Sequence, residues 1–129
     1  MGKGDIELKR VYEPSSPEDG RRVLVDRLWP RGLKKEEAHL FAWCREAAPS
    51  PDLRAWFGHR PERFEAFRTR YEAELRDNPD RRRAVDELLG WAGGEEGLTL
   101  LYAAKDERHN QAVVLRDHLR ARLDAGRAP

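Results

Sequence analysis

The sequence has little of several features that would place it in a familiar class of proteins. It has a single cysteine, Cys44, among 129 residues, so no disulfide can form within the chain, as is typical of proteins of the reducing cytosol. No apolar run at the amino terminus resembles a signal peptide, and no apolar segment is long enough to cross a bilayer. We therefore expect a soluble, cytoplasmic protein without a membrane partner, and the length favours a single domain over residues 1–129.

An excess of charge of one sign is also absent. Charged residues make up 38% of the chain, yet the net charge is only +1, which argues against a general binder of polyanions. The sequence contains neither a glycine-rich phosphate loop nor a nucleophile elbow. The histidines have no metal-binding spacing with one another or with Cys44, which we expect to be a buried, inert thiol. We predict no metal and no cofactor.

Three apolar segments, residues 5–13, 22–28 and 98–104, have the composition of strands. Periodic apolar residues with start and stop signals predict about five helices, over residues 34–48, 51–57, 61–77, 79–92 and 111–123. This order predicts an α/β fold, a small Rossmann-like open sheet with a mainly parallel core. The link between the first two strands holds only one helical turn, at residues 16–20, and is short for a parallel crossover. A hairpin in a mixed sheet stays open as the alternative.

The segment RVLVDRLWPRG, residues 22–32, passes from an apolar strand directly into charge, proline and glycine. In an open parallel sheet the strands' carboxyl ends share one edge, where ligands bind. Basic side chains there, beside the amino terminus of the last helix, suit a phosphate or a carboxylate. The candidate ligand-binding residues are Arg27, Trp29, Arg31, Lys105 and Asn110, the candidate proton carriers are Asp26 and Asp106, and Tyr12 and His109 are further candidates.

These residues allow several functions. The favoured one is a small enzyme or binding protein for an anionic ligand, with a nucleotide among the candidates, and whether it is an enzyme is left open. A single-stranded nucleic-acid module would stack bases on Trp29, but the balanced charge counts against it. A non-catalytic interaction module would expose Trp43 and Trp56. The plainest alternative is that the charges only pair with one another and Asn110 only caps a helix. The oligomeric state is not indicated.

Several segments together resemble a known family. DGRRVLVDRLWPRG, APSPDLRAWFGH and LTLLYAAKDERHNQAVVL are similar, in order, to the YeaO-like branch of the domain of unknown function 488. The resemblance implies a Rossmann-like start with parallel strands and adds Arg54 and Tyr71 as possible site residues. Other branches carry cysteines near the last strand, where this chain has Tyr102 and Asn110, so no thiol chemistry is carried over. The family name implies no established reaction.

Overall fold

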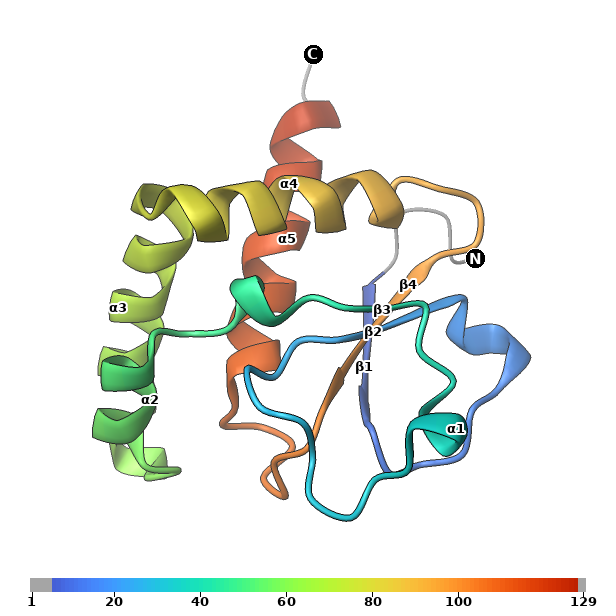
Figure 1. Cartoon of the computed structure of the whole chain (residues 1–129). Coiled ribbons are helices and arrows are strands. Elements are labelled where there is room, and N and C mark those ends of the chain that lie inside the picture. Colours follow the sequence, from blue (N-terminus) through green and yellow to red (C-terminus); the bar gives the residue numbers. More distant parts are fainter. Residues whose placement is uncertain (1–5, 128–129) are drawn as a thin grey trace.

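The computed structural model describes residues 6–127 and contains one four-stranded sheet (Figure 1). All of its strand pairs are parallel, in the order β1-β4-β2-β3. The strands are β1 (Ile6–Arg10), β2 (Arg21–Leu24), β3 (Ala42–Trp43) and β4 (Leu98–Tyr102). The predicted α/β class and parallel core are therefore confirmed, whereas likeness to Rossmann folds stays a prediction. Within the described residues, no helix is both long enough and apolar enough to span a bilayer.

Strand β4 explains how the short link between the first two strands can join parallel neighbours. Leu98 pairs with Ile6 on one side and with Arg21 on the other, so β4 separates β1 from β2. The hairpin alternative is wrong, because β1 and β2 share no ladder of hydrogen bonds. All five residues of β4 are buried, as expected for a central strand covered on both faces.

The strands end earlier than predicted. The amide of Glu13 donates to the Arg10 carbonyl and turns the chain after β1. Beyond β2, Val25 still bonds to Leu101, but Asp26 already belongs to the loop. Residue 5 of the first predicted strand lies outside the described residues.

Four helices lie close to their predicted positions, with boundaries moved by a few residues. Pro61 opens a 3-10 turn, η3 (Pro61–Arg63), before the α-helix that the pattern predicted there. The turn expected at residues 16–20 is also 3-10, η1 (Pro17–Asp19), and Ser16 caps it. The long helices are α2 (Pro51–Phe57), α3 (Phe64–Asp77), α4 (Pro79–Ala92) and α5 (Gln111–Arg127).

The helix predicted over residues 34–48 is wrong. The segment forms a single turn α1 (Lys35–Ala38), the edge strand β3 and a 3-10 turn η2 (Arg45–Ala47). His39 ends α1 in the left-handed conformation at φ 50°. The amides of Phe41 and Cys44 then bond to carbonyls of β2, at 2.7 and 2.8 Å, so pairing with the sheet overrides a stripe that had helical spacing.

Two apolar clusters cover the two faces of the sheet. The larger one joins inward residues such as Val23 and Leu100 to helices α2 to α5. The smaller one holds Leu24 and Leu101 under Trp29 and Trp43, from the segment that includes α1 (Figure 1). The alternation of residues along β2 and β4 thus places a core on both faces and leaves the carboxyl edge free for a site.

Candidate functional site

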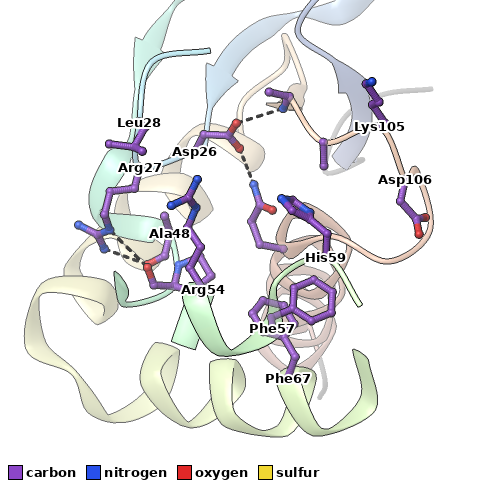
Figure 2. A pocket seen from close by; sticks show the side chains of 14 residues that line it. Asp26, Arg27, Leu28, Ala48, Arg54, Phe57, His59, Phe67, Lys105 and Asp106 are labelled. Atoms are coloured by element: carbon purple, nitrogen blue, oxygen red, sulfur yellow. Dashed lines mark hydrogen bonds between the residues drawn. The ribbon is translucent and has the colours of Figure 1, made fainter. Parts of the chain in front are cut away.

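A cavity of about 500 Å³ opens at the carboxyl edge of the sheet (Figure 2). Its walls come from the loop after β2, the segment before α2, the end of α2, the loop after β4 and the first residue of α5. This volume is within the usual range for small-molecule sites. The polar lining residues include Asp26, Arg27, Arg54, His59, Lys105 and Gln111.

Asp26 joins three elements at the base of the cavity. One carboxyl oxygen accepts a hydrogen bond from the Ala103 amide at 3.1 Å, and the other accepts one from the side-chain amide of Gln111. Burial raises the pKa of Asp26 to about 6, although these hydrogen bonds and the charges of Arg54 and His59 act to lower it. The side chain therefore fixes the end of β2 to the end of β4 and to the start of α5, while its charge is poorly compensated.

Arg27 holds the framework of the cavity rather than standing free in it. Its guanidinium donates to the carbonyls of Ala48 and Pro49, at 3.1 and 3.3 Å, as the dashed lines in Figure 2 show. It also lies 4.0 Å from Glu46. Since these bonds occupy the Nε and one terminal nitrogen, only part of its donor capacity remains for a ligand.

The segment Ala47–Ser50 forms one wall of the cavity and is held from behind. Tyr71, fully buried, donates its hydroxyl to the Ala47 carbonyl. Glu74 accepts bonds from the amide and hydroxyl of Ser50, at 2.9 and 2.6 Å. The burial raises the pKa of Tyr71 far above its usual range, so it stays a neutral donor. Tyr71, a candidate from the sequence, thus supports the wall and does not line the cavity.

Arg81, on α4, completes this support. Only 8% of Arg81 is exposed. Its Nε donates to the Ala48 carbonyl at 3.0 Å and lies 3.5 Å from Glu74. Its neighbours Arg82 and Arg83 are exposed, and helical spacing alone does not distinguish the buried arginine from them.

Three basic residues around the cavity are exposed. Within residues 6–127, the side chains of Arg54, His59 and Lys105 make no hydrogen bond or ion pair. Figure 2 shows Arg54 and His59 turned toward Asp26, with Lys105 at the opposite rim from Arg27. His59 follows Gly58, and both residues adopt the left-handed conformation, at φ 58° and 54°. A non-glycine residue at positive φ is uncommon, and the turn places His59 over the cavity.

Asp106 and His109 form a local unit on the loop after β4. One Asp106 oxygen accepts bonds from the amides of Arg108 and His109, both at 2.9 Å, and the other lies 3.0 Å from Nδ1 of His109. The two backbone bonds, and then the imidazole, lower the pKa of Asp106. Asp106 lines the cavity rim, whereas His109 packs its ring edge-on against Phe64 and does not line it.

Asn110 caps helix α5. Its Oδ1 accepts from the amide of Val113 at 3.1 Å, and its Nδ2 donates to the Asp106 carbonyl at 2.8 Å. Only 1% of the residue is exposed, and it does not line the cavity. The cap fixes the start of α5 at the edge of the cavity, where Gln111 contributes to the lining.

The remaining candidates from the loop after β2 lie beside the cavity and not in it. Trp29 donates its indole N–H to the Leu33 carbonyl at 2.8 Å and packs edge-on against Trp43 at 5.3 Å. Tyr12 donates its hydroxyl to the carbonyl of Arg31 at 2.7 Å. Trp29 therefore packs on the second face of the sheet, whereas Tyr12, which follows β1, and Arg31 are exposed, and none of the three lines the cavity.

Sequence reasoning missed His59 and Gln111. Gln111 had a usable signal, since the residue after a predicted cap at the carboxyl edge must lie near the strand ends. His59 had only the helix stop at Gly58 as a signal, and nothing in the local pattern fixes where α2 ends relative to the sheet. Among the described residues, no cluster of acidic, histidine and cysteine side chains could hold a metal ion.

Comparison with known proteins gives relatives but no activity. The chain is 41% identical over 117 residues to the uncharacterized protein YeaO of Escherichia coli K12, covering 91% of this chain and 98% of that protein. It is 40% identical over the same length to the uncharacterized protein Rv3073c of Mycobacterium tuberculosis H37Rv, covering 95% of it. No solved structure matches the chain.

A family model described as the inactive DUF488-N3 subclade matches residues 5–128, nearly the whole length. The match and the YeaO relative agree with the resemblance carried by the DRLWPRG and LLYAAKD motifs. The chain therefore belongs to the domain of unknown function 488, within the subclade described as inactive.

Proposed function

We propose that this chain is a non-catalytic binding protein for a small molecule that carries a carboxylate or phosphate group. The ligand occupies the cavity at the carboxyl edge of the sheet, with its acidic group between Arg54 and His59. The observation that carries the proposal is that these side chains, together with Lys105, are without partners around a hollow. Arg54, His59 and Lys105 are exposed and so accessible to a ligand, whereas the buried Arg22 and Arg81 are engaged by carbonyls and carboxylates.

The first turn of α5 adds to the attraction for an anion. Asn110 satisfies the amide of Val113, and the amides of Gln111 and Ala112, which precede it, belong to the turn whose partial positive charge faces the cavity. The helix has 17 residues, so its terminal dipole is fully developed. The unpartnered side chains and the helix end therefore act on the same place.

Binding without catalysis fits the acidic residues better than proton transfer does. Asp26 is fixed in place by one bond to each oxygen, which suits a stationary acceptor for a bound group. Asp106 is held in its own turn with a lowered pKa, which makes it a weak general base. The description of the subclade as inactive supports the same choice.

The other two functions have weaker support. Trp29 is hydrogen-bonded and packed on Trp43, so it is not set out as a platform for a nucleic-acid base. Trp43 and Trp56 are covered by arginines, with Arg45 at 4.1 Å from the first ring and Arg70 at 4.3 Å from the second. This arrangement leaves little continuous apolar surface of the kind that an interaction module presents.

Calorimetry with inorganic phosphate and 3-phenylpropionate tests the proposal. We expect at least one of them to bind, and Arg54→Ala to weaken it by roughly tenfold or more, as for loss of a charge-assisted hydrogen bond. Arg83→Ala is the matched control, since Arg83 is exposed on α4, pairs with Asp80 at 3.1 Å and does not line the cavity. Equal weakening by the two variants, or no saturable binding of either acid, would overturn the proposal.

A further inference from the structure

The cavity places the carboxylate of Asp26 beside Arg54 and His59. Asp26 interacts electrostatically with both Arg54 and His59, and all three line the same space. A simple anion bound between Arg54 and His59 would therefore lie near the charge of Asp26, which repels it. The arrangement is complementary to a ligand that presents a negative charge to Arg54 and His59 and a positive charge to Asp26.

Resting on the function proposed above, we infer that the ligand is amphoteric, with an acidic group at Arg54 and His59 and an amino group that donates to Asp26. Free amino acids and short peptides have this chemistry. The acidic group is the part already proposed, and the amino group is the addition that Asp26 requires.

Asp26 has capacity for such a donor. A carboxylate offers about four acceptor positions, and one bond is made to each oxygen, from Ala103 and Gln111. The side-chain amide of Gln111 donates to Asp26, so its own oxygen is an additional acceptor, and no hydrogen bond to that oxygen is formed within residues 6–127. An ammonium group with three donors could use both acceptors.

Burial also leaves the charge of Asp26 in need of a positive neighbour. The raised pKa, about 6, shows that loss of hydration outweighs the present hydrogen bonds and the nearby cations. A bound ammonium would supply the missing compensation, whereas a bound acid alone would increase the imbalance.

The rest of the cavity is apolar and suits a hydrophobic side chain. Phe57 and Phe67 stack with ring centroids 4.3 Å apart and contribute to its lining. Pro49, Ala48 and Leu28 add further apolar atoms. An aromatic amino acid would therefore place its ring against these apolar side chains and its charged groups between Arg54 and Asp26.

Three probes with the same ring and chain separate the parts of this inference. Phenylalanine carries both groups, 3-phenylpropionate only the acid, and phenethylamine only the amine. Calorimetry measures their affinities, and amide shifts of Ala103 and Gln111 in nuclear magnetic resonance spectra locate the binding. We expect phenylalanine to bind roughly tenfold or more tightly than either single-group probe, with shifts at both amides.

Variants then assign the two groups. Asp26→Asn should reduce the advantage of phenylalanine over 3-phenylpropionate to about threefold or less, because the amide is neutral and still fits the same space. Arg54→Ala should weaken both acids and leave phenethylamine almost unchanged. Because the comparison of probes in the unaltered protein needs no variant, a failure of Asp26→Asn to fold does not remove the test.

The outcomes distinguish the inference from the function on which it rests. If 3-phenylpropionate binds at these amides as tightly as phenylalanine, the amphoteric ligand is refuted and the acid site stands. If only phenethylamine binds, or none of the three probes does, the amphoteric ligand is refuted. The proposed acid site is refuted as well if inorganic phosphate also fails to bind.

Discussion

The charge of Asp26 should make the protein less stable as the pH rises, and replacing it with asparagine should remove this effect. Asparagine can accept from the Ala103 amide and, after rotation of the Gln111 amide, donate to its oxygen. The variant therefore imitates the protonated form of Asp26 in shape and hydrogen bonding. What it removes is the burial of a negative charge.

The magnitude follows from the pKa. Below the unfolded value of 3.8, Asp26 is protonated in both states and contributes no pH dependence. Between 3.8 and about 6 the folded state keeps a proton that the unfolded state has released, so the free energy of unfolding falls as the pH rises. Above about 6 the penalty is complete, and the change from 3.8 to about 6 corresponds to about 3 kcal/mol.

Urea denaturation followed by tryptophan fluorescence measures this directly. The difference in unfolding free energy between Asp26→Asn and the unaltered protein should grow by about 2 kcal/mol from about pH 4 to about pH 8, in favour of the variant. Other titrating groups are common to both proteins and cancel in the difference. Asp106→Asn is the control of opposite sign, because the pKa of Asp106 is lowered and its ionised form stabilises the fold above its unfolded pKa.

A difference that stays constant with pH, or that shrinks toward pH 8, would refute the reasoning. It would mean that Arg54, His59 and the hydrogen bonds compensate the Asp26 charge fully in the free protein. The same result would weaken the case for an amino group in the ligand, because the carboxylate would then need no further positive partner.

The remaining predictions concern two glycines of the fold and the cap of α5. Gly20→Ala should lower the unfolding free energy by about 2 kcal/mol or more in the same urea assay, because Gly20 lies at φ 62° and an added Cβ would meet the Glu96 carbonyl oxygen at 2.0 Å. Gly90→Ala should instead raise the unfolding free energy by up to about 1 kcal/mol, because a Cβ added there, inside α4, has no other atom within 4 Å. Asn110→Ala should cost about 1 kcal/mol through loss of the cap on α5 and should weaken binding of 3-phenylpropionate, and an unchanged stability and affinity would show that the cap does not position this end of the helix.

The sequence allowed the location of the sheet edge to be predicted. It did not allow a prediction of which charged residues there are bonded to the protein and which are available to a ligand. Apolar strands ending in charge indicated where the edge lies, and Asp26, Arg27, Lys105 and Asp106 do line the cavity there. Whether a charged side chain is hydrogen-bonded within the protein depends on contacts between segments that are distant in the sequence. The bond from Arg27 to the Ala48 carbonyl spans 21 positions, and no local pattern contains it.

The same limit explains the missed strand and the misplaced helix. Residues 42–43 form a strand only because β2 offers an open edge to their backbone, which is a tertiary condition. Conversely, helix α2 was predicted with its cap at Ser50 and its stop at Gly58, since both signals are local. Arg54 could therefore be placed on a helix, whereas its direction toward Asp26 depended on how α2 packs against α3.

At the carboxyl edge, some charged residues hold the fold together and others do not. This difference indicates which residues a subclade described as inactive must keep for its fold. Side chains near the strand ends, such as Asp26 and Arg27, are bound into the frame by distant backbone groups, so changing them would disturb the fold as well as any ligand. The spare groups, Arg54 and His59, come from α2 and the turn after it and are not needed by that frame within the described residues. Arg54 and His59 lower the pKa of Asp26 and so already favour its charged form, but the effect of burial is larger. If the proposed function holds, a bound ligand supplies the remaining compensation, because its amino group would lie against Asp26.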